Sequence, residues 1–515
     1  MAGAAASPAT MTMAAADGKY PSPIEGVSDA YDKLPPSFKA VAAIPGKGSK
    51  VTLLHQYFNG AAPVPRDQNK YWQELEKRLG VTYEPTFVPG GSYDEKFAAV
   101  AASGDFPDLV FLGNTPAQLA AINQGAFTDL TAYLSGDGLK EFPNIGTISP
   151  QLFKNLSVKG KLYGVPGSRS IVANPLIFRK DWQESLGLAA PKNADDFLNM
   201  MVAFAKNDPD GNGRPDTYGL GSGNGTGVLC VSFMQQMFRA PNQWRLNPDG
   251  TLTNTIETEE FKQALTFMNR LHAAGGYHPD APSITGQPLK DNFSGGKYGA
   301  FSDAITALQD GIAYTTLQVN PKAKITALPP PGFDGGKPNT FNSLGWGYYL
   351  AIPSKVGRDR ERTKELLRVV DYFCAPFGSE EWRFVNYGLE GPHHTTQPDG
   401  SIVRTMQGER EIADFKRTAN GPQSYYVPAV PGIAREMQTI AAQMVAVGIN
   451  NPVNGQFSPT NAMKGSVLDQ LFVDRVVALT TGREPLSALD AWVKDWRSRG
   501  GDMIRKEYEL ALKGQ

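Results

Sequence analysis

Apolar and polar positions alternate in blocks from about Lys50 onward. Short runs rich in β-forming residues predict strands, and stretches with apolar residues spaced three and four apart predict helices. The order is strand, helix, strand, helix, strand, helix. The predicted strands cover 51–58, 81–88 and 109–112, and the predicted helices cover 67–79, 92–103 and the segment from Thr115 to a stop at Gly125.

This alternation predicts a parallel sheet covered on both faces by helices. In such sheets ligands bind beyond the carboxyl ends of the strands, at a switch point. Gly113 and Asn114 follow the end of one predicted strand, and residues 55–60 contain the end of another predicted strand. The middle of the chain is a looser α/β mixture, and the last third is mostly helical. The later predictions are an extended crossing over 327–338, a strand over 343–353, and helices over 363–374, 432–447, 460–480 and 485–512.

Composition narrows the function classes. The chain has 515 residues, 41% of them hydrophobic and 20% charged, which predicts two to four globular domains. Fifty basic and 51 acidic residues nearly cancel, so the chain as a whole does not attract nucleic acid or anionic lipid. The sequence shows no apolar run of about 18 residues and no signal peptide. Residues 1–48 are rich in Ala, Pro, Ser and Gly and predict a flexible tether. Cys230 and Cys374 are expected to be buried free thiols, with a disulfide as the alternative.

One motif predicts a metal ion. Oxygen-bearing side chains stand at positions 1, 3, 5 and 9 of a loop with glycine at position 6, which is the spacing of a calcium loop. Position 12, where an EF-hand has a bidentate glutamate, is Gly219, so the motif predicts a structural calcium loop and not an EF-hand switch. The alternative is a solvated turn. The predicted ligands are Asp208, Asp210, Asn212, the backbone carbonyl of Arg214, and Asp216, with Gly213 at the sharp turn.

Catalytic motifs are not visible in the sequence. The chain has no zinc-protease HExxH, no P-loop and no GxSxG nucleophile elbow. His393 and His394 are interpreted as structural rather than as metal ligands, and residues 221–227 as a flexible loop rather than a phosphate cradle. A pair of carboxylates for glycoside hydrolysis remains an open alternative.

Aromatic residues suggest a sugar site, because sugar rings stack on flat aromatic faces. The chain has 7 Trp and 19 Tyr, most of which are expected in the core. Trp346 is the strongest candidate, because Gly345 and Gly347 leave clearance for a ligand on either side. The others in loop-like surroundings are Trp244, Tyr57 and Tyr387.

Several segments together resemble the bacterial extracellular solute-binding proteins of carbohydrate ABC importers. The most similar group is the calcium-loop proteins that bind alginate oligosaccharides. The segments that carry the resemblance run in the family's order over 102–112, 158–166, 178–188, 208–216, 294–301, 345–353, 386–395 and 500–512. Two positions depart from the family pattern, Thr217 beside the calcium loop and His394 in the segment 391–395.

The resemblance implies an α/β, two-lobed periplasmic-binding-protein-like fold. Each lobe would be a mostly parallel sheet flanked by helices, with a ligand cleft between the lobes that closes on binding. It also implies export, as a cell-surface lipoprotein or a periplasmic protein whose lipid anchor lies outside this chain, and a monomer that delivers an oligosaccharide to ABC permease subunits. The expected division is a tether over 1–48, a first lobe over 49–166 plus about 298–348, and a second lobe over 167–297 plus about 349–515.

The site hypotheses follow from strand ends and loop positions. Trp346 is predicted to be the stacking platform, and Arg169 to pair with the carboxylate of an acidic sugar. Hydroxyl-binding side chains are predicted at Asn114, Ser302 and Asp303, and Glu390 and His393 are predicted to reach the cleft. The alternatives are a glycosidase or lyase, a binding protein for a non-sugar solute, and a surface adhesion module.

Overall fold

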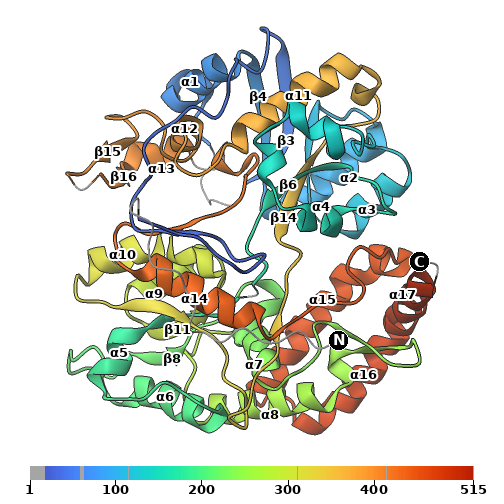
Figure 1. Ribbon diagram of the computed structural model, residues 1–515. Helices are drawn as coiled ribbons and strands as arrows, with labels where there is room; N and C mark the ends of the chain where they lie inside the picture. The colour runs from blue at the N-terminus through green and yellow to red at the C-terminus, as the bar shows by residue number, and fades with distance from the viewer. Residues whose placement is uncertain are drawn as a thin grey trace.

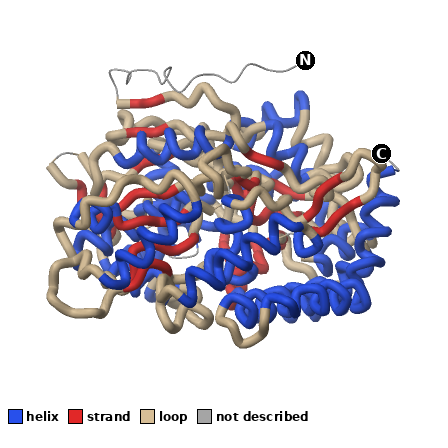
Figure 2. Tube along the Cα trace, turned by 90° about the horizontal axis from the view of Figure 1, so that it is seen from below, coloured by secondary structure: helices blue, strands red, loops and turns tan. Residues whose placement is uncertain are grey.

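The computed structural model describes residues 18–57, 63–113, 115–172, 174–309, 311–398, 400–412 and 415–513. Figure 1 shows two lobes, one above the other, and each contains segments from distant parts of the sequence. Figure 2, seen from below, shows helices lying around the strands. The predicted two-lobed α/β fold is therefore confirmed.

The upper lobe, called lobe 1 below, is built on a five-stranded sheet with the order β4-β3-β5-β14-β6. The first three strands are parallel, while β14 is antiparallel to both β5 and β6. All four side chains of β5 are buried, as expected for a strand covered on both faces. The strands are β3 (Lys50–Tyr57), β4 (Thr82–Pro89), β5 (Leu109–Leu112), β6 (Gly164–Ser168) and β14 (Trp346–Ala351).

Four helices of lobe 1, α1, α2, α3 and α11, begin close to the predicted positions. The first begins at Lys70, because the side chain of Asn69 accepts a hydrogen bond from the Trp72 N–H, and it ends at Gly80 with φ of 65°. The second begins at Tyr93, and the side chain of its N-cap residue Ser92 makes no capping bond. The helices are α1 (Lys70–Leu79), α2 (Tyr93–Ser103), α3 (Pro116–Asn123), α4 (Pro150–Leu156), α11 (Arg360–Phe373), α12 (Glu380–Tyr387) and α13 (Met406–Ile412), with a hairpin of β15 (His394–Thr396) and β16 (Ile402–Arg404).

The lower lobe, lobe 2, has a four-stranded sheet with the order β12-β7-β11-β8. β11 pairs in parallel with β8, while β7 is antiparallel to both β11 and β12. Both sheets are therefore mixed, but each has only one strand that runs against the others, β14 in lobe 1 and β7 in lobe 2. The strands are β7 (Leu176–Arg179), β8 (Tyr218–Leu220), β11 (Tyr298–Ser302) and β12 (Ile325–Leu328), with a separate hairpin of β9 (Trp244–Leu246) and β10 (Leu252–Asn254).

Helices surround the sheet of lobe 2 and continue to the end of the described chain. Those before the C-terminal region are α5 (Lys180–Ser185), α6 (Ala194–Lys206), the short 3-10 helix η5 (Gly225–Cys230), α7 (Val231–Met237), α8 (Glu259–Ala273), α9 (Gln287–Ser294), α10 (Ile312–Val319) and α14 (Ile433–Val445). The C-terminal helices are α15 (Pro459–Thr480), α16 (Leu489–Trp496) and α17 (Asp502–Lys513). Of these, α15 contacts both η5 of lobe 2 and α3 of lobe 1.

Lobe membership differs from the predicted division. Both β11 and β12 pair with β7 in the sheet of lobe 2, so these two strands do not belong to lobe 1. Conversely, buried residues from Tyr348 to Ala419 join the core of lobe 1. The sequence carries no signal for this exchange, because a short, fully buried strand does not encode which sheet it joins.

The N-terminal segment 18–48 is folded, so the prediction of a tether was wrong there, while residues 1–17 lie outside the described residues. Two short strands, β1 (Lys19–Tyr20) and β2 (Ala30–Tyr31), form a sheet with β17 (Tyr425–Tyr426). Val27 and Ala30 are buried in a core cluster of lobe 2. The chain then passes to lobe 1, where the Arg383 side chain donates to the Pro35 carbonyl and Gly46 N–H donates to the Leu79 carbonyl.

Two crossing segments run side by side between the lobes. Arg169 N–H donates to the Gly345 carbonyl and Ser343 N–H donates to the Ile171 carbonyl, both at 2.8 Å. The crossing therefore lies at 342–345. Most of the Pro-rich run 327–338 stays on lobe 2, where the Phe333 ring stacks on Phe238 at 5.2 Å.

Each lobe has its own apolar core, and each core contains one cysteine. Cys374 lies in the core of lobe 1 and Cys230 in the core of lobe 2. Both are buried free thiols, as predicted. Burial raises the pKa of the Cys230 thiol to about 12 and the pKa of the Cys374 thiol well above its ordinary value.

Candidate functional site

Strand ends of lobe 1 meet at the edge that faces lobe 2. The carboxyl ends of β3, β5 and β6 and the amino end of β14 all lie at this edge, because β14 is antiparallel to β5 and β6. The edge carries Tyr57, Gly113, Ser168 and Trp346, with Arg169 one residue beyond β6. Asn114, predicted to bind a hydroxyl, lies outside the described residues.

Strand ends of lobe 2 face the same junction. Ser302 ends β11 and is buried, and its N–H donates to the Ser222 carbonyl at 2.9 Å. Asp303 follows, and its carboxylate lies 3.4 Å from Lys290 Nζ of α9. The structure therefore brings Tyr57, Arg169 and Trp346 to one side of the lobe junction and Ser302 and Asp303 to the other, as strand-end reasoning predicts.

Trp346 does not have the open faces predicted for it. Its side chain is 9% exposed and meets the Tyr349 ring edge-on at 5.4 Å. The space beside Gly345 is filled by Ile171 and Leu152, and the space beside Gly347 is filled by Arg169. The flanking glycines admit neighbouring side chains rather than a ligand, so the predicted clearance was wrong.

Two buried polar groups beside Trp346 lack hydrogen-bond partners. Ser168 pairs with Trp346 across the two strands, and neither Ser168 Oγ nor Trp346 Nε1 has a partner among the described residues. Buried polar groups are nearly always hydrogen-bonded, so these two suit a ligand hydroxyl or a water. Sequence reasoning missed Ser168, although a serine at the end of a buried strand is a usable signal.

Arg169 brings a positive charge to this junction. Its guanidinium lies 5.9 Å from the Tyr348 ring centre, and it forms no ion pair with an acidic side chain in the described ranges. Nearby, the Tyr348 hydroxyl and the Asn420 side-chain amide are hydrogen-bonded at 2.9 Å. Asn420 was also missed, although the polar stretch 417–424 between two buried segments would have indicated another crossing of the lobes.

The predicted residues of the segment 387–393 do not lie at the strand ends. His393 is fully buried; its Nδ1 accepts from the Leu389 N–H at 2.9 Å, so Nε2 carries the proton and donates to Glu411 at 3.0 Å. Tyr387 packs against the rings of Trp382 and His394, and Glu390 is exposed. These residues hold the hairpin of lobe 1 against α12 and α13, and the interpretation of the histidines as structural agrees with the contacts of His393.

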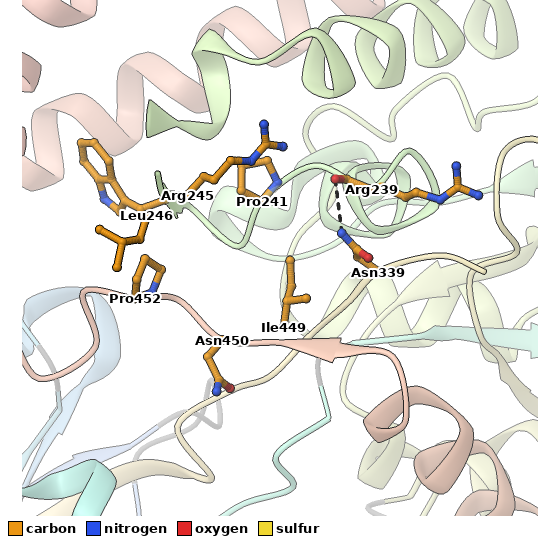
Figure 3. Close-up of a pocket in the computed structure, with 9 residues that line it drawn as sticks. Arg239, Pro241, Arg245, Leu246, Asn339, Ile449, Asn450 and Pro452 are labelled. Atoms are coloured by element: carbon orange, nitrogen blue, oxygen red, sulfur yellow. Dashed lines mark hydrogen bonds between the residues drawn. The ribbon is translucent and has the colours of Figure 1, made fainter. Parts of the chain in front are cut away.

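Trp244 lies in lobe 2, where its ring packs against Trp496 at 5.9 Å and Tyr508 at 6.0 Å. It lines a pocket of about 280 Å³, shown in Figure 3, whose walls include Pro241, Leu246, Ile449 and Pro452. The two arginines of this pocket are already paired, Arg239 with Asp334 and Arg245 with Glu260. Trp244 is therefore separate from the strand-end site.

The predicted calcium loop joins α6 to β8. Asn212 Nδ2 lies 2.9 Å from Asp210 Oδ2 and 3.2 Å from Asp216 Oδ1, so two carboxylates converge on one point. Gly213 N–H donates to Asp208 and lowers the pKa of that carboxyl. Burial, together with the neighbouring carboxylates of Asp208 and Asp216, raises the pKa of Asp210.

The oxygen set of this loop fits a hard cation, because carboxylates crowded together are stabilised by a positive charge. Within the described ranges, however, no group of three or more His, Cys, Asp or Glu side chains is arranged ready to hold a metal ion. Arg214 N–H donates to Asn212 Oδ1, and the Thr217 hydroxyl donates inward to the Phe204 carbonyl. Thr217 therefore adds no ligand to the loop.

A family model for bacterial extracellular solute-binding proteins matches residues 62–370, which is more than half of the chain. The chain belongs to this family. The prediction of a transport component rather than an enzyme is confirmed, as is the prediction of an extracytoplasmic protein. None of the helices in the described part of this solute-binding protein is both long and apolar enough to cross a membrane.

Curated relatives match most of the solute-binding protein. Lipoprotein LipO of Bacillus subtilis is 27% identical over 458 residues, covering 86% of this chain and 88% of its own. The polygalacturonan/rhamnogalacturonan-binding protein YtcQ of the same species is 24% identical over 474 residues, covering 91% and 92%.

Solved structures share the fold of the solute-binding protein. The alginate-binding protein AlgQ2, crystallised without calcium ion, superposes with a TM-score of 0.67 at 15% identity, covering 92% of this chain and 100% of its own. The FusA binding protein of Streptococcus pneumoniae in complex with kestose superposes with a TM-score of 0.64 at 18% identity. The match covers 90% of this chain and 100% of the FusA chain. At these identities the likeness shows the fold alone.

Proposed function

We propose that this solute-binding protein captures an oligosaccharide between its lobes by hinge closure and delivers it to an ABC importer. The main support for this proposal is that strand ends from both lobes converge on one junction. Beside this junction, Ser168 Oγ and Trp346 Nε1 are buried without a hydrogen-bond partner among the described residues. The names of YtcQ and FusA, which refer to polygalacturonan or rhamnogalacturonan and to fructooligosaccharide, support a saccharide as the ligand class.

Each junction residue has a proposed role. Trp346 offers its indole N–H, and Ser168 and Asp303 bind hydroxyls. Arg169 forms a charge-assisted hydrogen bond, which is strongest with a carboxylate on an acidic sugar such as a uronate. No reacting group is required, since closure alone buries the ligand and shifts the open form to the closed form.

We also propose that the loop 208–216 binds a calcium ion as a structural element. Asp208, Asp210, Asn212 and Asp216 would supply side-chain oxygens and Arg214 its backbone carbonyl. The convergence of two carboxylates on Asn212 Nδ2 supports this proposal. Two of the similar structures are described as AlgQ2 without calcium ion and as an EF-hand mutant of FusA, which also supports this proposal.

Thermal unfolding with a panel of neutral and acidic oligosaccharides tests the proposed capture. A ligand at about 100 times its Kd stabilises the native state by about 2.7 kcal/mol, so a cognate saccharide must raise Tm. The R169Q variant should keep the Tm of the free protein and lose most of the shift with acidic saccharides. If no saccharide of the panel raises the Tm of the well-folded protein, the ligand is to be sought among peptides and other solutes.

A further inference from the structure

A second pocket, distinct from the strand ends, lies where three distant segments meet. It has a volume of about 470 Å³, within the range of small-molecule sites. The N-terminal segment contributes Tyr20, Tyr31 and Lys33, the β15–β16 hairpin of lobe 1 contributes Ser401, and the segment leading into α14 of lobe 2 contributes Tyr426 and Arg435. These six residues, together with Asp32 of the N-terminal segment, define the tyrosine pocket.

The tyrosine rings are held rigidly. Phe377 of lobe 1 lies 4.4 Å from the Tyr31 ring and 5.5 Å from the Tyr426 ring, so it backs both. Tyr20 donates its hydroxyl to Asp32 at 2.6 Å. Rings fixed in this way lose little conformational entropy when a ligand stacks on them. The pocket therefore offers preformed aromatic faces of the kind that sugar C–H surfaces contact.

The charge of the pocket favours an anion. The Arg435 guanidinium lies 4.9 Å from the centre of the Tyr20 ring, and Lys33 stands in the same wall. Neither cation forms an ion pair with an acidic side chain in the part of the chain that is described. Asp32 is the one acidic side chain among the lining residues, and it already accepts the Tyr20 hydroxyl. The lining side chains therefore carry two positive charges and one negative charge.

We propose that the tyrosine pocket binds a carboxylate-bearing sugar unit, a hexuronate, separately from the strand-end site. The sugar ring stacks on the tyrosines, and its carboxylate pairs with Lys33 and Arg435. This inference does not rest on capture at the strand ends, because the two sites share no residue. It gives the folded N-terminal segment a role in binding.

Calorimetric titration with D-galacturonate and with neutral D-galactose tests the tyrosine pocket. The K33Q/R435Q double variant should bind galacturonate at least tenfold more weakly than the unaltered protein, with galactose binding unchanged. The matched control is K39Q/R358Q, which removes the same charge from two exposed positions outside the pocket and should leave both titrations unchanged.

Equal galacturonate affinity in K33Q/R435Q and in the control would overturn the inference, as would a lack of galacturonate binding by the unaltered protein. Repeating the titration with R169Q separates the two sites. Loss of binding in R169Q but not in K33Q/R435Q would place the uronate at the strand ends and not in the tyrosine pocket. A Y426L variant, checked for its native melting curve, should also weaken galacturonate binding.

Discussion

At the scale of single residues, His393 illustrates how contacts decide between a ligand and a structural role. Its ring is fully buried, with both nitrogens engaged, by Leu389 N–H and by Glu411. Glu411 also accepts from Gln407 and from Tyr71 N–H. Burial alone would raise the pKa of Glu411, but these hydrogen bonds outweigh it and hold the pKa below its ordinary value.

We expect the E411Q variant to lose about 1–3 kcal/mol of unfolding free energy near neutral pH, because charged hydrogen bonds to buried groups are removed. Since the folded-state pKa is depressed, this stabilisation is complete above the ordinary range of glutamate and is lost as the pH falls through the folded-state pKa. Urea unfolding at neutral and acidic pH measures the difference, which should narrow toward acid. E409Q, at an exposed neighbour, is the control, and an equal loss there would contradict the assignment.

At the scale of elements, the N-terminal segment is the clearest case in which composition misleads. Pro, Ala and Gly predict a tether, yet Ala30 is fully buried and pairs through β2 with β17. We expect A30D to lower the unfolding free energy by about 3 kcal/mol or more, because it buries an unpaired charge. S37D, exposed in the same segment, should change it by at most about 0.5 kcal/mol. Equal effects in chemical denaturation would mean that the segment is not packed on lobe 2.

The loop 208–216 gives a second prediction at this scale. If calcium offsets the mutual repulsion of its carboxylates, a chelator should lower Tm, and added calcium should restore it while magnesium restores it less. The D208N/D216N variant should melt near the chelated protein and no longer respond to calcium. If a chelator leaves the Tm of the unaltered protein unchanged, the loop is a hydrogen-bonded turn that does not bind calcium.

Elements with a strong periodic pattern were predictable, and pairings between distant segments were not. The helices at α11, α14 and α15 begin within a few residues of the predicted positions, because their apolar stripes are encoded locally. The strand over 298–302 was assigned to the wrong lobe, since its partners lie more than 70 residues away in sequence. At the site, strand-end positions such as Arg169 and Asp303 were predictable. The filled space around Trp346 was not, because it depends on side chains of two other segments.

At the scale of the whole molecule, the paired crossings at 169–172 and 342–345 indicate a hinge. Gly345 has φ of 77°, and a Cβ there would meet Ile171 and Leu152 within about 3 Å, so this position accepts only glycine without strain. We expect a cognate saccharide to lower the radius of gyration in X-ray scattering, as closure brings the lobes together. A non-cognate sugar at equal concentration is the control. An unchanged curve with a ligand that raises Tm would mean that binding occurs without closure.

The placement of the two cysteines has a practical consequence for measuring such motions. Because one shielded thiol lies inside each lobe, reaction with a maleimide or a disulfide reagent requires that particular lobe to open. Mass spectrometry of the two cysteine-containing peptides after pulsed labelling would then report two opening rates from one sample. Equal rates would show that the lobes unfold as a single cooperative unit. Unequal rates would identify which lobe opens first, and fluorophores could be attached to engineered surface thiols without removing either native one.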